Sequence, residues 1–187
     1  MPPRGPCSLP LAALAAAALA AGAAAAPRTC FDIFETMCIE HEIDATAGTV
    51  TFNATCTQAL FQDPGWCAFG LSLSGSSSMG NAEVFWISLL STGQVSVEDR
   101  FNPKGHDSPV CVQQVSKGAG AVDGATGALT ATWTRPLNVS GTGLAPIASG
   151  QSFHAISAWA GRKSQQATAC AAGWPEHSAT GSATLKF

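Results

Sequence analysis

Short runs of alternating apolar and polar residues, separated by turn-forming residues, fill most of this chain after residue 45. In 129–134, threonines occupy one face while leucine, alanine and tryptophan occupy the other. A period of two with β-branched and aromatic residues is typical of half-buried strands, and no convincing 3.6-residue apolar stripe follows residue 26. Turn signals such as Asp63-Pro64-Gly65 and Asn102-Pro103 separate the runs. The pattern predicts an all-β fold, an antiparallel immunoglobulin-like β-sandwich.

The same alternation gives the expected positions of the strands. The glycine-rich segment from Ala119 to Gly127 is expected to be a hairpin loop. The expected strands are Cys38–Ile43, Thr49–Cys56, Trp66–Leu73, Val84–Leu90, Val95–Phe101, Cys111–Ser116, Leu129–Arg135, Phe153–Ala160 and Ala183–Phe187.

The first 26 residues have the composition of a secretory signal. Arg4 supplies a positive charge, and an almost pure Ala/Leu run from Leu9 ends in the small residues 23–26. Small residues at the end of such a run favour cleavage over a membrane span. We therefore expect residues 1–26 to be a signal peptide and residues 27–187 to be one domain, secreted to the extracellular space without a membrane anchor.

Six of the seven cysteines follow the expected signal peptide. An even number in a chain bound for an oxidising compartment predicts three disulfides, with 15 possible connectivities left open. No Cys-x-x-Cys zinc pattern and no Cys-x-x-Cys-His pattern for covalent haem occurs. The six are Cys30, Cys38, Cys56, Cys67, Cys111 and Cys170.

The charge of the chain limits the class of partner, and its sequons predict a modification. The net charge is −3, only 11% of the residues are charged, and no basic cluster occurs. This argues against nucleic acid or an anionic membrane as the partner. The sequons Asn53-Ala54-Thr55 and Asn138-Val139-Ser140 predict a glycoprotein.

Met79 stands in a polar loop, directly after Ser76-Ser77-Ser78. A thioether contributes nothing to a turn, so two interpretations remain: a gap-filling core residue, or a soft ligand for a metal such as iron. His177, far along the chain in Trp174-Pro175-Glu176-His177, offers a matching nitrogen donor.

The other three histidines compete with His177 for that role. His41 lies between two glutamates and is expected to face solvent, and His106 lies in a polar turn. His154 alternates with Phe153 and Ala155, so its side chain could face the core or the solvent.

Five motifs in a fixed order extend from the Met79 region to the end of the chain. The first is Trp-x-x-Phe-Gly-Leu-Ser at 66–72, followed by a Gly/Ser loop and Met-Gly-x-Ala at 79–82. The others are Gly93 to Asp99, Thr132 to Leu137, Ile156 to Ala160 and His177 to Gly181. Over roughly residues 45–187 the chain resembles the DOMON domain, in particular its haem-binding type, the cytochrome domain of cellobiose dehydrogenase.

The resemblance implies a cofactor and its ligands. Met79 and His177 fall on the positions of the two axial ligands of a non-covalent haem b, and they are the expected metal ligands. Arg135 matches a family motif, with either a structural role or pairing with a haem propionate. The expected cofactor-binding residues are Met79, His177, Phe69, Trp86, Trp133 and Phe153.

The function expected from this resemblance is that of a secreted b-type cytochrome domain. Two protein ligands fill both axial positions of the iron, which favours one-electron transfer over oxygen activation. The partner would be a separate extracellular redox protein or a small-molecule reductant. The alternative is a non-catalytic carbohydrate- or ligand-binding module without haem, in which tryptophans stack on sugar rings. No catalytic constellation stands out, so an enzyme is not expected.

Overall fold

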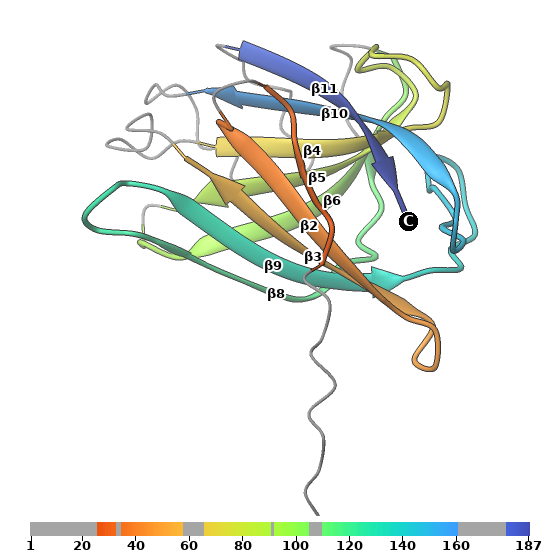
Figure 1. Ribbon diagram of the computed structural model, residues 1–187, viewed down its shortest axis with the longest axis horizontal. Coiled ribbons are helices and arrows are strands. Elements are labelled where there is room, and N and C mark those ends of the chain that lie inside the picture. The colour runs from red at the N-terminus through yellow and green to blue at the C-terminus, as the bar shows by residue number, and fades with distance from the viewer. Residues whose placement is uncertain (1–25, 33–34, 58–65, 91, 105–109, 161–178) are drawn as a thin grey trace, which may run out of the picture.

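The computed structural model describes residues 26–32, 35–57, 66–90, 92–104, 110–160 and 179–187 (Figure 1). Across these residues it contains strands and no helix, and the strands form two antiparallel sheets. The expected β-sandwich is therefore confirmed. The strands are β1 (Arg28–Cys30), β2 (Met37–Asp44), β3 (Thr49–Cys56), β4 (Trp66–Ser72), β5 (Ala82–Leu89), β6 (Val95–Asn102), β7 (Val110–Cys111), β8 (Ser116–Val122), β9 (Leu129–Pro136), β10 (Ser152–Ala160) and β11 (Ala179–Lys186).

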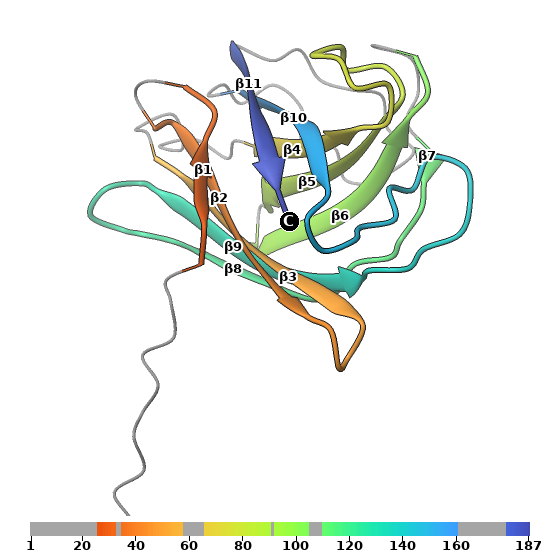
Figure 2. The ribbon, with the colours of Figure 1, turned by 45° about the vertical axis from the view of Figure 1, so that its right-hand side comes forward.

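The two sheets lie face to face, as Figure 2 shows. The five-stranded sheet has the order β1-β2-β3-β9-β8, and the six-stranded sheet has the order β11-β10-β4-β5-β6-β7. In the six-stranded sheet, β4 lies between β10 and β5, with Gly70 opposite both Ile156 and Val84. This register decides which side chains share the outer face of that sheet.

Aromatic rings from both sheets fill the space between them. Phe52 of β3 lies 5.5 Å from Phe69, 5.4 Å from Phe85 and 5.4 Å from Trp133, measured between ring centroids. All four side chains are fully buried. Because offset and tilted ring pairs at these distances are favourable, they add to the burial of apolar area.

The one clear error in the expected strands lies between β6 and β9. Residues 111–116 were expected to form one strand and 119–127 a loop, but the structure has β7 and β8 there. β8 consists mainly of small residues, which have low strand propensity. A side chain at Gly120 would meet Val95 Cγ1 at 2.6 Å, so glycine lets β8 lie directly against β6. β1 is a further strand that the sequence pattern does not predict.

Every cysteine in the described part of the chain is in a disulfide. Cys30 pairs with Cys38, which joins β1 to β2. Cys56 pairs with Cys67, which joins β3 to β4 and so links the two sheets. Cys111 is disulfide-bonded as well. These bonds agree with the expectation of a disulfide-stabilised chain.

Replacing both Cys56 and Cys67 by alanine is expected to lower the free energy of unfolding by about 3 kcal/mol, because the bond closes a loop in the unfolded chain. Urea unfolding measures the loss. The Cys30→Ala/Cys38→Ala double variant is the comparison. Its loop is of comparable length, with a separation of 8 residues against 11, so a loss of similar size is expected. A Cys56→Ala/Cys67→Ala protein as stable as the wild type would contradict the expectation.

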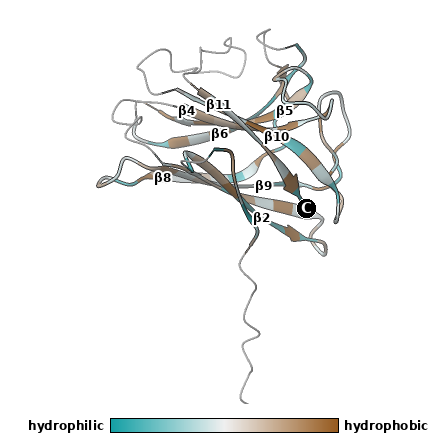
Figure 3. Cartoon of the chain, turned by 45° about the horizontal axis from the view of Figure 1, so that its top comes forward, coloured by the Kyte–Doolittle hydropathy of each residue, from teal (hydrophilic) through white to brown (hydrophobic). Residues whose placement is uncertain are grey.

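The outer faces of the two sheets differ in polarity, and Figure 3 shows the hydropathy along their strands. On the five-stranded sheet, Thr51 Oγ1 lies 3.1 Å from Thr134 Oγ1, and Thr132 Oγ1 donates a hydrogen bond to Asn53 Oδ1 at 2.7 Å. The corresponding face of the six-stranded sheet carries an apolar cluster on β4, β5 and β10. The described residues include no helix long and apolar enough to cross a membrane.

Candidate functional site

An apolar cluster covers the outer face of the six-stranded sheet. An outer face that met only water would carry polar residues at every second position. Here both faces of β4 are buried along its whole length. Met79 packs against this outer cluster. Its buried members are Trp66, Ala68, Ala82, Val84, Trp86, Ile156 and Ala158.

Two adjoining hollows lie at this cluster, and together we call them the outer cleft. The first is a narrow hollow with a cavity volume of about 10 Å³, and Met79, Gly70 and Trp86 are among its lining residues. The second is partly open to solvent and lies between Met79 and β11, with a cavity volume of about 370 Å³. Met79, Ile156 and Ser157 line both hollows. Only the second hollow has a volume in the range of sites for small molecules.

The loop that carries Met79 is held by its own serines. Ser72 Oγ lies 3.2 Å from Ser74 Oγ and accepts a hydrogen bond from the Ser76 amide at 3.2 Å. Ser78 Oγ accepts one from the Gly80 amide at 3.1 Å. Such side-chain-to-backbone bonds fix tight turns. The serine run therefore positions the thioether, which explains a polar loop around an apolar residue.

Small residues form the floor of the outer cleft. Gly70 lies in the middle of β4, where glycine costs strand stability. A Cβ there would meet Ile156 Cγ1 at 2.9 Å and the Glu83 carbonyl oxygen at 3.1 Å. Ala68 and Ala158 line the same hollow. The floor is thus flat and shallow, as a planar ring would need.

Tryptophans form one wall of the outer cleft. Trp66 and Trp86 stack with ring centroids 3.9 Å apart. The Arg100 guanidinium lies 4.7 Å from the centroid of the Trp86 ring and pairs with Glu98 Oε2 at 2.7 Å. A cation over an indole face is attracted by the ring and limits its motion. Trp86 is therefore held on both faces.

The structure brings two of the sequence-predicted cofactor residues together, Met79 and Trp86. Phe69, Trp133 and Phe153 lie instead in the core between the sheets, so they do not line the outer cleft. His177 lies outside the described residues, and so does His106.

The two remaining histidines are within the described residues. The expectation that His41 faces solvent is wrong, because it is buried with its ring 4.6 Å from that of Phe187. Burial lowers the pKa of His41. His154 is half-buried and alternates with Phe153 and Ala155, which belong to the core. Its side chain therefore lies on the outer face, the same side as Ile156.

Glu83 and Asp99, which the sequence analysis missed, form a charged cluster inside the core together with Arg135. Arg135 Nη1 lies 3.4 Å from Glu83 Oε1, and both side chains are fully buried. Arg135 also donates a hydrogen bond to the Ala145 carbonyl oxygen, while the Ala145 amide donates to Glu83 Oε2 at 2.7 Å. Arg135 thus has a structural role, which decides between the two roles left open for it.

Asp99 is the second buried carboxyl of this cluster. Its Oδ2 accepts a hydrogen bond from the Gln114 amide at 3.2 Å, and its Oδ1 has no hydrogen-bond partner among the described residues. Burial and the neighbouring Glu83 charge raise the pKa of Asp99 to about 8, although Gln114 and Arg135 oppose the shift. Burial also raises the pKa of Glu83, against the opposing effect of Arg135. Glu83 lies two residues from Phe85, and Asp99 two residues from Val97, so each shares one face of its strand with an apolar residue. This spacing was a sequence signal for the inward positions of both carboxyls.

The raised pKa of Asp99 predicts a pH-dependent stability. Between about pH 4 and pH 8 the native state holds a proton that the unfolded chain has lost, so the free energy of unfolding falls as pH rises. The slope is at most about 1.4 kcal/mol per pH unit. Urea unfolding of the Asp99→Asn variant should show a flatter dependence between pH 5 and pH 8, and an unchanged slope would contradict this assignment.

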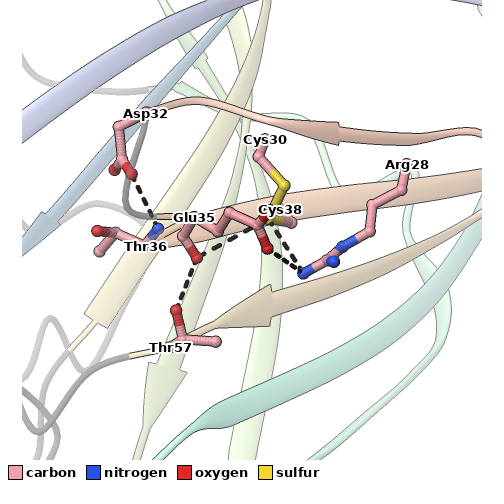
Figure 4. A network of polar contacts seen from close by, with 7 residues as sticks. All are labelled: Arg28, Cys30, Asp32, Glu35, Thr36, Cys38 and Thr57. Atoms are coloured by element: carbon pink, nitrogen blue, oxygen red, sulfur yellow. Dashed lines mark hydrogen bonds and ion pairs between the residues drawn. A yellow bond between two sulfur atoms is a disulfide. The ribbon is translucent and has the colours of Figure 1, made fainter.

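One group of possible metal ligands is excluded by its own chemistry. Cys30, Glu35 and Cys38 lie close together, but the two sulfurs are joined in a disulfide (Figure 4). Thiolates, not disulfide sulfurs, bind metals strongly. Figure 4 shows Glu35 paired instead with Arg28, at 3.2 Å. This cluster therefore closes the turn between β1 and β2.

Comparisons with known proteins relate the chain to others by fold. No model of a protein family matches the sequence, and no curated protein matches it. Among solved structures, the cytochrome b domain of pyranose dehydrogenase from Coprinopsis cinerea superimposes with a TM-score of 0.59 at 11% sequence identity. The match covers 80% of this chain and 76% of that one. At this identity the similarity concerns the fold.

Proposed function

We propose that the protein is a b-type cytochrome domain that transfers single electrons. The observation that carries the proposal is Met79 at an apolar hollow with a glycine floor, on the outer face of the six-stranded sheet. The similarity of the fold to a cytochrome b domain supports it.

The residues of the outer cleft fit a haem. A thioether is a soft, neutral ligand suited to haem iron, and aromatic and aliphatic walls suit the porphyrin. Glycine at position 70 lets the Ile156 side chain lie close to β4, which keeps this part of the floor low. We propose Met79 and His177 as the axial ligands. Haem b held there would supply a one-electron Fe(III)/Fe(II) couple.

The other groups around the outer cleft exclude water from it and hold the Met79 sulfur in place. Trp66, Trp86 and Ile156 exclude water from the hollow, which strengthens electrostatic interactions within it. The serine loop holds the Met79 sulfur on one side of the hollow. If Met79 and His177 both held the iron, no position would be left for oxygen, and the haem would supply electron transfer and not oxygen activation.

The proposed partner is a separate extracellular redox protein or a small-molecule reductant. Secretion follows from the proposed signal peptide and agrees with the disulfides. We also propose N-glycans at Asn53 and Asn138, both of which are exposed.

The carbohydrate-binding alternative has less support. Stacking on a sugar ring needs an exposed tryptophan face. The four tryptophans within the described residues, Trp66, Trp86, Trp133 and Trp159, are all less than 10% exposed.

Replacing Gly70 by alanine is expected to weaken haem binding by roughly tenfold, because the added Cβ would displace the Ile156 side chain that lines the outer cleft, and overpacking of this kind costs on the order of 1–3 kcal/mol. Titration of the haem-free protein with haem, followed by absorbance, measures the affinity. Gly124→Ala is the matched control, since a Cβ at Gly124 meets nothing within 4 Å. Equal affinities for the two variants would contradict a haem seated on this floor.

The absorption spectrum of protein expressed with ample haem tests the proposed function. A Soret band that persists after gel filtration, with a low-spin spectrum in both oxidation states, is expected. A protein that retains no haem after the same treatment would refute the proposal.

A further inference from the structure

The buried cluster of Glu83, Asp99 and Arg135 contains two carboxyls and one guanidinium. All three side chains have no exposed surface. With both carboxylates ionised, the cluster would hold one net negative charge in the interior, which is costly. One proton on a carboxyl removes that net charge. Asp99 is the better acceptor, because Glu83 has the closer contacts with Arg135 and the Ala145 amide.

This cluster lies one sheet thickness behind the outer cleft. Glu83 and Val84 are consecutive residues of β5, so their side chains point to opposite faces of the sheet. Val84 lines the outer cleft, and Glu83 belongs to the cluster. On β6, Asp99 lies opposite Phe85 and Arg100 lies opposite Val84. The backbone of the six-stranded sheet lies between the two sites.

We infer that Asp99 is a redox-linked proton site, so that the protein takes up a proton from solvent when it accepts an electron. The inference rests on the proposed function. The electron comes from an external one-electron reductant, which is oxidised, and the haem iron is reduced from Fe(III) to Fe(II). The proton binds to an Asp99 carboxylate oxygen, so the positive charge lost at the iron is replaced within the cluster.

The direction in which reduction changes the pKa of Asp99 follows from the charges. A ferric centre has one more positive charge than a ferrous one, and it therefore favours the ionised carboxylate. Reduction removes that charge, so the pKa of Asp99 is higher in the ferrous protein than in the ferric protein. Coupling across a protein interior is much stronger than in water because the effective dielectric constant is lower.

Among the described residues, two charged groups act on Asp99. Glu83 faces it from β5 and Arg135 from β9, while the Gln114 amide binds it from the segment before β8. On β6 itself, Glu98 and Arg100 point to the opposite face, where they pair with each other. The pKa of Asp99 is therefore set first by burial, then by the Glu83 charge, with the Gln114 amide and Arg135 acting in the opposite direction.

The test is a redox titration of the haem-loaded protein between pH 6 and pH 9. In the wild type, the midpoint potential should fall as pH rises, by at most about 59 mV per pH unit, which corresponds to one proton per electron. In Asp99→Asn the potential should lose most of this dependence. Asp123→Asn, in an exposed turn, should keep it. Reduction of wild-type protein in weak buffer with a pH indicator should also show proton uptake.

The outcomes separate the two proposals. A protein without a Soret band refutes the cytochrome function and this inference with it. A haem protein whose potential is constant across this range overturns the inference alone. An Asp99→Asn protein that keeps the wild-type pH dependence also overturns it, because propionates or histidines would then be responsible. If Asp99→Asn does not fold, the absence of proton uptake by the wild type is the overturning result.

Discussion

Replacing Arg135 by methionine is expected to lower the free energy of unfolding by roughly 3–5 kcal/mol, the range found when one partner of a buried ion pair is removed. The change leaves Glu83 buried without its cation and the Ala145 carbonyl oxygen without its donor. Urea unfolding at pH 7 measures the loss. The loss should be smaller at low pH, where Glu83 becomes neutral by protonation.

Arg100→Met is the matched control for Arg135→Met. Arg100 is equally buried, but its partner Glu98 is 17% exposed and can be hydrated. A smaller loss is expected there. Adding Glu83→Gln to Arg135→Met should restore part of the stability, because no charge is then left unpaired. An Arg135→Met protein as stable as the wild type would contradict the structural role of this pair.

Replacing the proposed iron ligands is expected to change the haem in different ways. Met79→Ala should open one axial position and lower the reduction potential, since a neutral thioether ligand raises it. His177→Ala should release the haem or abolish the low-spin spectrum. Absorption spectra in both oxidation states and a redox titration measure these effects.

Met79→Leu separates ligation from packing. Leucine keeps most of the volume of methionine in the outer cleft and removes only the sulfur. The variant should retain the fold and lose the low-spin spectrum. If it matches the wild type in spectrum and potential, Met79 is a packing residue and the ligand assignment fails.

Much of the fold could be predicted because the alternation of residues is strong in the central strands. The segment Thr49–Cys56 was expected as a strand with the bounds that β3 has. The signal is weak in β8, where Gly118 and Gly120 contribute no apolar face of their own. There the strand is defined by packing on Val95 and Val97, and single-sequence patterns do not contain that contact.

The site could be predicted only in part, for a related reason. Alternation divides β4 into two faces but does not say which face meets the other sheet. Both faces of this strand are apolar, so Phe69 appeared as suitable for a cofactor wall as any residue on Gly70's face. The pairing of β4 with β10 and β5 decides the matter, because Gly70, Ile156 and Val84 share the outer face.

His41 shows a similar limit. Two neighbouring glutamates suggested exposure, yet inward packing against Phe52 and Phe187 determines its position.

The most direct measurement of the central proposal is the location of iron in a crystal of the haem-loaded protein, by anomalous scattering. The iron should lie over Gly70 in the outer cleft, with Met79 Sδ at about 2.3 Å, on the order of metal–sulfur bonds. His177 should bind from the opposite side. Iron found elsewhere on the protein, or beyond bonding distance of Met79, would contradict the proposal.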